Sequence, residues 1–335
     1  MTVVRSIVIG RNEESRLSLA LASVAAAGLP AVYVDSASSD GSVALARARS
    51  VPVIELASPP PLSAARGRNA GGAYWRETAP EVQYFLFLDG DCELEPGFVT
   101  TALQTFQAQP ATAVVVGALR ETGQSHGMFA ALAELEWAGT PGVITNFADL
   151  GGIMLARAGA FTAVGGFDPL MVAGEDSEFG VRLALAGYGV VRIAAPMAVH
   201  EHGIRSFAAW WQRARRAGLA LTHRYLKHGR GPLADCRREF WSTLGWGWLL
   251  PLAIILLLYP TRGLSLLGSS GYGLLGLRMY RSYRRRGTTP RLAAAAAGLG
   301  LVAKFANAAG MLTFARQRLA GTVQLIEYKR IKGTA

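Results

Sequence analysis

The chain has 335 residues, enough for one large domain or two ordinary ones with a substantial core. Hydrophobic residues make up 51% of it and charged residues only 17%, which excludes a disordered chain and is more apolar than a typical soluble enzyme. The two cysteines, Cys92 and Cys236, exclude a disulfide framework, and no CxxC pair indicates structural zinc.

The charge is divided unevenly along the chain. Residues 1–199 carry 12 basic and 19 acidic side chains, a net charge of −7, whereas residues 200–335 carry 22 and 4, a net charge of +18. A uniformly basic chain would suggest binding to nucleic acid. Here the basic excess coincides with the apolar C-terminal part, so we expect membrane lipids as partners and no nucleic acid.

Apolar runs and helical stretches alternate through the first 90 residues. Strands are predicted at 3–9, 31–34, 51–56 and 84–88. Helices are predicted at 15–27, 40–50 and 63–78. This alternation predicts an α/β fold with a mainly parallel sheet flanked by helices on both faces. The first apolar run is too short for a signal peptide, so we expect the start of the chain to remain in the cytoplasm.

Polar residues follow three of the predicted strands. Arg11-Asn12-Glu13-Glu14 comes after the first, Asp35 ends the second, and Asp89-Gly90-Asp91 follows the fourth. Ligands of parallel sheets bind beyond the carboxyl ends of the strands. Acidic groups on one rim repel one another unless a cation lies among them, and Asp-x-Asp lets two carboxylates approach one Mg²⁺ or Mn²⁺. Because the sequence has neither GxxxxGK[ST] nor GxGxxG after the first strand, a metal–diphosphate site is the remaining interpretation.

The C-terminal part contains three apolar segments, at about 240–260, 263–277 and 292–315. The first is long enough to span a membrane and has aromatic flanks; the alternative is a buried core helix. The arginine cluster at 278–286 predicts a cytoplasmic location, so we expect the first two segments to form a hairpin. For the third segment we expect a helix lying in the interface, with Lys304 and Arg316 directed toward the headgroups.

Six motifs in a fixed order resemble one family. They are 8–14 (VIGRNEE), 34–42 (VDSASSDGS), 65–71 (ARGRNAG), 88–91 (LDGD), 165–168 (GGFD) and 174–179 (GEDSEF). The chain is similar to family 2 glycosyltransferases with the GT-A fold, over about residues 3–220. The resemblance implies a Rossmann-like GT-A domain at 1–230 followed by a membrane-associated helical region at 231–335.

The resemblance also implies roles for residues at the sheet edge. Those expected to contact the donor nucleotide or its sugar are Arg11, Asn12, Glu13, Asp35, Ser36, Asp40, Arg66, Asn69 and Asp89. Ser36 stands where many members carry aspartate, which leaves the base open between uridine and guanosine. Arg66 and Asn69 could instead belong to a solvated helix face. Gly151 and Gly152 would let the backbone approach the sugar or acceptor.

Metal and catalytic roles are implied in the same way. Asp91, with Asp89 and His200, would hold Mn²⁺ or Mg²⁺, and a weaker assignment falls on His202. Asp176, with its neighbour Glu175, is the candidate catalytic base that deprotonates the acceptor hydroxyl; a helix N-cap is its alternative role. Arg215 would bind diphosphate or an anionic lipid, or else form part of a cationic face beside the membrane.

The implied activity is inverting, metal-dependent transfer of a single sugar. The donor would be a UDP or GDP sugar, and the acceptor would be lipid-linked or close to the membrane. We expect the enzyme at the inner membrane with its catalytic domain in the cytoplasm. A processive polysaccharide synthase is disfavoured because Arg216 replaces the tryptophan of that group's Gln-x-x-Arg-Trp motif. A non-catalytic nucleotide- or lipid-binding scaffold is a further alternative.

Overall fold

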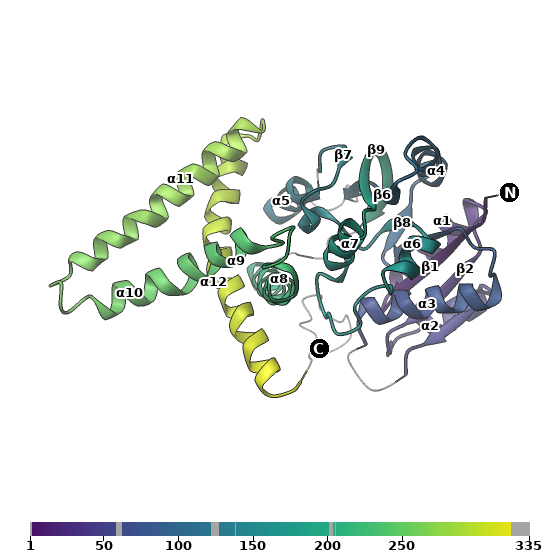
Figure 1. The fold of residues 1–335 in the computed structure, drawn as a ribbon, viewed down its shortest axis with the longest axis horizontal. Helices are drawn as coiled ribbons and strands as arrows, with labels where there is room; N and C mark the ends of the chain where they lie inside the picture. The colour runs from purple at the N-terminus through teal and green to yellow at the C-terminus, as the bar shows by residue number, and fades with distance from the viewer. Residues whose placement is uncertain are drawn as a thin grey trace.

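The computed structural model describes residues 2–57, 62–121, 127–137, 139–200, 204 and 206–322. Figure 1 shows a sheet surrounded by helices in the N-terminal part and a group of long helices in the C-terminal part.

A single mixed sheet is the centre of the N-terminal part. Its strands are β1 (Val4–Gly10), β2 (Ala31–Asp35), β3 (Val53–Glu55), β4 (Tyr84–Asp89), β5 (Cys92–Leu94), β6 (Thr112–Glu121), β7 (Gly142–Val143), β8 (Met154–Arg157) and β9 (Gly189–His200). They lie in the order β3-β2-β1-β4-β8-β6-β9-β5, with β7 paired to β9. The first four are parallel, as predicted, whereas β8 is antiparallel to both of its neighbours. The sheet is therefore parallel on one side of β4 and mixed on the other.

Helices pack against the sheet through apolar faces. They are α1 (Glu14–Ala26), α2 (Ser42–Ala48), α3 (Ala64–Thr78), α4 (Phe98–Ala108), α5 (Met128–Trp137), α6 (Ala158–Ala163) and α7 (Glu175–Leu185), with a 3-10 turn at Phe147–Asp149. In α1 the buried residues are Leu17, Ala20, Leu21 and Val24, the spacing of one helical face. Strand β1 is buried on both sides, which explains why Ile7, Val8 and Ile9 form a continuous apolar run.

Helix α3 lies unusually close to the sheet because it carries glycines on its inner face. A Cβ at Gly71 would lie 2.4 Å from the Ile7 side chain, and one at Gly67 would lie 3.3 Å from Ile9. A larger side chain would push the helix outward. The close approach brings Arg68, on the same face of α3, to the carboxyl edge of the sheet.

The C-terminal part consists of long helices, most of whose residues are not buried. They are α8 (Phe207–His228), α9 (Arg237–Leu244), α10 (Leu250–Leu256), α11 (Ser270–Arg285) and α12 (Pro290–Leu319). A π-helical turn at Gly245–Leu249 joins α9 and α10 into one helix, and α11 runs back beside it as the predicted hairpin (Figure 1). Within the described residues, Arg237–Leu256 and Pro290–Leu319 are long and apolar enough to cross a membrane. The arginine cluster that we expected to follow the returning segment lies largely within α11.

Helix α12 packs across α8 rather than lying apart. At the crossing, a Cβ on Gly310 would lie 2.1 Å from the backbone oxygen of Arg215. Lys304, which we predicted to be directed toward the headgroups, has a partner within the protein. Its Nζ donates a hydrogen bond of 3.0 Å to Ser242 Oγ on α9, because α12 turns this position toward the hairpin.

The α8–α12 crossing can be tested with two glycines of the same helix. Gly310→Ala should lower the free energy of unfolding by about 1–3 kcal/mol, because the added methyl meets backbone that cannot move aside. Gly298→Ala is the matched control: nothing lies within 4 Å of its added Cβ, so it should be neutral or slightly stabilising. Chemical unfolding in detergent micelles measures both, and equal effects would contradict the tight crossing.

Candidate active site

The loops after β1 and β2 are hydrogen-bonded to each other. Asn12, which has a left-handed φ of 57°, donates from its backbone N to Ser38 Oγ at 2.8 Å. Its side-chain oxygen accepts from the backbone N of Ser39 at 2.7 Å. Asp35 is 2% exposed and accepts from the backbone N of Ser38 at 2.7 Å and from the Tyr33 hydroxyl at 3.0 Å. Asn12 and Asp35 therefore build the rim on which Arg11 is exposed.

Asp40 anchors the start of α2. Its carboxylate accepts from the backbone N of Ser42 at 3.0 Å and from that of Glu14 at 3.1 Å, while the backbone N of Glu13 donates to Ser42 Oγ. Burial acts to raise the pKa of Asp40, but the hydrogen bonds from Ser42 and Glu14 outweigh it and lower the pKa. Ser36 is buried. The observed contacts of Asp40 therefore hold the start of α2 to the loop after β1.

The two residues of α3 that we predicted to contact the donor have different partners. Arg66 donates to the backbone oxygen of Ala57, just beyond β3, at 3.0 Å. Asn69 donates to the Phe167 oxygen at 2.7 Å and accepts from the Phe167 nitrogen at 2.8 Å. Both polar atoms of Asn69 are thus engaged by one backbone position. The expected position of Asn69 near the base or diphosphate is not supported, because its amide holds the Gly166–Phe167 loop.

Arg68, which the sequence reasoning missed, connects the two acidic motifs. It is 2% exposed, and its guanidinium donates to Asp89 Oδ1 and to Glu175 Oε1, each at 2.8 Å. The ring of Phe167 lies 5.4 Å from the guanidinium carbon. Helical spacing could have identified this residue, because Arg68 follows Ala65 by three positions and precedes Trp75 by seven, and all three are buried.

The two predicted glycines have different surroundings. A Cβ on Gly152 would lie 2.0 Å from Arg68 Nη2, so this glycine leaves room for the guanidinium. Gly151 is exposed, and a Cβ there would meet open space. Close approach to a substrate therefore remains a prediction for Gly151, whereas Gly152 has an observed structural reason.

A candidate metal site lies beside β5 and β9. These strands pair antiparallel with Cys92 opposite His200. His200 Nε2 lies 3.4 Å from Asp91 Oδ2, and the Cys92 thiol donates to Asp91 Oδ1 at 3.2 Å. One potential ligand atom from each residue lies within 4.8 Å of the others. A carboxylate with an imidazole fits Mn²⁺ better than Mg²⁺, which prefers oxygen ligands alone.

The observed cluster differs from the predicted set of metal ligands. Asp89 does not belong to the cluster, because Arg68 holds its carboxylate and its side chain is 39% exposed. Cys92, a third potential ligand, was missed, although its position directly after Asp91 was the available signal. His202 lies outside the described residues.

The acidic residues at the start of α7 have contrasting environments. The helix begins after Gly174, whose φ is +71°, so Asp176 lies inside the first turn and is not the N-cap. Burial and the neighbouring Glu175 raise the pKa of Asp176 to about 6, while Arg68 and Arg224 act to lower it. Asp176 Oδ1 accepts from the backbone N of Ser177 at 2.6 Å. A carboxylate with this pKa is ionised at neutral pH and able to take up a proton.

Glu178 secures α7 from its other side. Its fully buried carboxylate contacts Arg182 at 2.8 Å, Lys227 at 2.8 Å and His228 at 2.9 Å. Burial acts to raise its pKa, but these three partners hold the pKa well below its usual range. Lys227 and His228 belong to α8, so this cluster joins α7 to α8.

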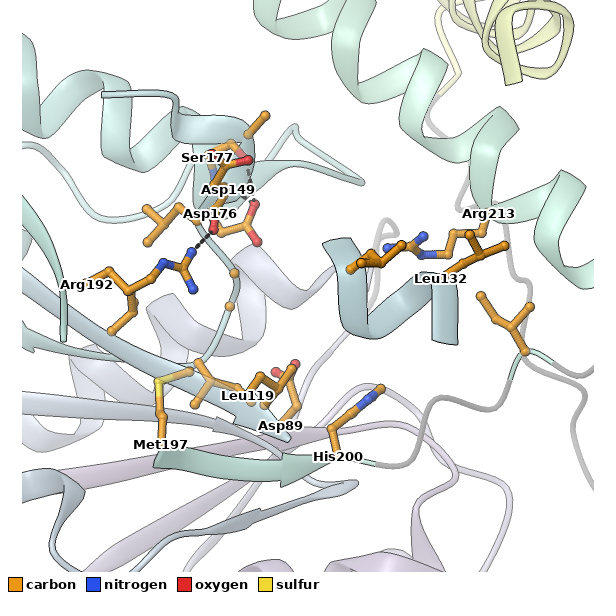
Figure 2. Close-up of a pocket in the computed structure, with 18 of the residues that line it drawn as sticks. Asp89, Leu119, Leu132, Asp149, Asp176, Ser177, Arg192, Met197, His200 and Arg213 are labelled. Atoms are coloured by element: carbon orange, nitrogen blue, oxygen red, sulfur yellow. Dashed lines mark hydrogen bonds between the residues drawn. The ribbon is translucent and has the colours of Figure 1, made fainter. Parts of the chain in front are cut away.

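A cavity of about 680 Å³ brings several of these groups together. Asp89, Asp176 and His200 line it, as do Arg192, which donates to the Asp149 backbone oxygen at 2.6 Å, and Arg213 (Figure 2). Neither Glu175 nor Arg215 is among its lining residues. Glu175 is held by Arg68, and Arg215 donates to Gln212 at 3.4 Å. The cavity-lining arginine of α8 is Arg213, two positions earlier than predicted.

Searches of solved structures returned glycosyltransferases with low sequence identity. The mannosyltransferase PcManGT from Pyrobaculum calidifontis, in complex with GDP-Man and Mn²⁺, has a TM-score of 0.57 and 19% identity over 89% of this chain and 86% of its own. TarS from S. aureus has a TM-score of 0.53 and 13% identity; the match covers 76% of this chain but only 45% of TarS. TarS 1-349 in complex with UDP has a TM-score of 0.50 and 14% identity, with full coverage of both chains. A search of curated proteins gave no match.

Family profiles match most of the chain. The profile described as glycosyl transferase family 2 matches residues 6–160, and that of glycosyl transferase family group 2 matches residues 84–280, more than half of the chain. The structural neighbours have the same GT-A fold. The chain therefore belongs to the family 2 glycosyltransferases and is a glycosyltransferase with a GT-A fold.

Proposed function

We propose that this glycosyltransferase moves a single sugar, with inversion, from a nucleoside diphosphate sugar to a lipid-linked or membrane-proximal acceptor. The observation that carries the proposal is one cavity lined by Asp89, Asp176 and His200, with the carboxylate of Asp91 3.4 Å from His200 Nε2. A carboxylate of raised pKa lies in the same cavity as residues suited to a cation and a diphosphate.

Asp176 is the proposed general base. With a pKa of about 6, its carboxylate is about nine-tenths ionised at pH 7. It takes the proton of the acceptor hydroxyl while that oxygen bonds to the anomeric carbon of the sugar. The bond from this carbon to the diphosphate oxygen breaks on the opposite face, and the diphosphate leaves with the bonding electrons. Glu175 is a positioning residue: through its ion pair with Arg68 it holds the first turn of α7, on which Asp176 lies.

Asp91 and His200 are the residues that would hold a divalent cation, Mn²⁺ or Mg²⁺. When bound, such a cation neutralises negative charge on the diphosphate. Support comes from their donor chemistry, and from a structural neighbour that is in complex with Mn²⁺ and GDP-Man. Asp89 is better suited to a sugar or ribose hydroxyl, because Arg68 already occupies one of its oxygens.

The donor nucleotide would lie on the rim formed after β1 and β2. Arg11, Glu13 and Arg66 are its proposed contacts, on loops that Asn12, Asp35, Ser36 and Asp40 shape. Structural neighbours are in complex with UDP and with GDP-Man, so either base suits the proposal.

The helical region at 231–335 would attach the enzyme to the inner membrane, with the domain at 1–230 on the cytoplasmic side. Leu256, Tyr259 and Leu267 near the hairpin tip are at least 65% exposed. The opposite end of the hairpin carries arginines, including Arg238 and Arg281, as a cytoplasmic boundary requires.

Nucleotide binding can be measured by thermal shift of the detergent-solubilised protein. One nucleoside diphosphate with Mn²⁺ should raise the melting temperature, with a stabilisation of about 2.7 kcal/mol at 100 times the dissociation constant, and EDTA should remove most of this shift. Asp91→Asn should abolish the metal-dependent part. Glu81→Gln, a change to an exposed carboxylate that precedes β4, at the opposite end of that strand from Asp89, is the control. A folded protein that no nucleotide stabilises would overturn the proposal.

The role of Asp176 predicts both a rate loss and a pH profile. Asp176→Asn should lower kcat by about 10²- to 10⁴-fold while the nucleotide-induced thermal shift persists. In the unmodified enzyme, kcat/KM should fall as the pH drops below about 6, because protonated Asp176 cannot accept a proton. Retention of the acidic limb in Asp176→Asn, or of more than a tenth of the rate, would assign the base elsewhere.

Removing Arg68 should affect stability and the pKa of Asp176 together. Arg68→Met leaves Glu175 buried without its cation and should cost about 3–5 kcal/mol of folding free energy. It also removes a positive charge that lowers the pKa of Asp176, so the acidic limb of the pH profile should move to higher pH.

Two further variants keep the Arg68 test informative. Arg68→Lys retains the charge but cannot hold both carboxylates in the same way, so it should fold and still lose activity. Arg76→Met changes an exposed arginine of the same helix and controls for general effects on α3. An Arg68→Lys enzyme with unchanged rate and pH profile would show that the double ion pair has no part in positioning.

A further inference from the structure

The cavity extends beyond the carboxylates toward the C-terminal helices. Its lining includes Leu132 and Leu135 of α5 and Leu299 and Ala303 of α12. We call these four residues the apolar arm. A hydrocarbon chain lying against these side chains would be removed from water, which is favourable.

Two arginines line the same cavity. Arg213 of α8 extends toward Leu132 of α5, on the far side of Asp89 and Asp176 from Met197 and Arg192 (Figure 2). Arg286 follows directly after α11. Among the described residues, no carboxylate is paired with Arg286, so its charge is available to an anionic ligand.

Helix α12 lines this end of the cavity and is also a candidate membrane segment. It is one of the two described helices that are long and apolar enough to cross a membrane, and it contributes Ala296, Leu299, Gly300 and Ala303 to the lining. A molecule that reaches the apolar arm from the membrane therefore meets the arginines and the carboxylates within a single cavity.

We propose that the apolar arm binds the acceptor, an anionic lipid whose phosphate links its hydrocarbon chain to a hydroxyl-bearing headgroup. The phosphate contacts Arg213 and Arg286, the chain lies against Leu132 and Leu299, and a headgroup hydroxyl reaches Asp176. This assignment of the acceptor rests on the proposed function. Its test therefore measures lipid binding and does not depend on sugar transfer.

The probe is lysophosphatidylglycerol, which combines one hydrocarbon chain, a phosphate and a hydroxyl-bearing headgroup. Its binding to the full chain in detergent is compared with that of monoacylglycerol, which lacks the phosphate, and of glycerol phosphate, which lacks the chain. We expect both comparison compounds to bind at least tenfold more weakly. Equal binding by monoacylglycerol would remove the role of the arginines, and equal binding by glycerol phosphate would reduce the arm to a simple anion site.

Matched variants locate the binding in the cavity. Arg286→Ala should weaken lysophosphatidylglycerol binding about tenfold, whereas Arg285→Ala, one residue earlier and outside the cavity lining, should not. Leu299→Trp should block the arm, whereas Leu312→Trp, on the exposed part of the same helix, should leave binding intact. Equal effects within either pair would overturn the assignment.

The nucleotide-induced thermal shift distinguishes a failure of the lipid site from a failure of the proposed function. A protein that keeps the shift but binds all three probes equally refutes the lipid site and leaves the proposed function standing. A protein that binds the lipid through Arg286 but gives no shift with any nucleotide refutes the proposed function instead.

Discussion

The buried guanidinium of Arg68 is the constraint on which the site depends. It is the common partner of Asp89, at the end of β4, and Glu175, at the start of α7, which lie 86 residues apart in the chain. Burying a charge is unfavourable unless it is paired, so neither carboxylate can move without exposing or isolating the other charges. The glycines around it follow from this requirement, since Gly152 has no side chain where the guanidinium lies.

This pairing also explains how two adjacent carboxylates acquire different chemistry. Glu175 is tied to Arg68, whereas the only described hydrogen bonds to Asp176 come from Ser177. Burial and the negative charge of Glu175 then raise the pKa of Asp176 to about 6. Different surroundings of neighbouring acids are what separates a structural carboxylate from one that can exchange a proton at neutral pH.

Local patterns predicted what depends on local structure. The strands up to β4, the helices between them and the C-terminal hairpin follow from apolar periodicity and strand-end polarity. The pairing of Arg68 with Glu175, 107 positions away, and the engagement of Asn69 by Phe167 required the tertiary fold. Arg213 and Arg215 are equally basic in sequence, and only the rotation of α8 against α12 decides which one lines the cavity.

Helix α8 links the catalytic part to the helices beyond it. Near its C-terminal end, Lys227 and His228 hold the buried Glu178 of α7. In its middle it meets α12 at Gly310 with backbone in contact, and near its start Arg213 faces the cavity. A displacement of α12 would therefore move α8, and with it both the anchoring of α7 and the wall opposite Asp176. The same packing that encloses the apolar arm also sets the position of the carboxylate that it faces.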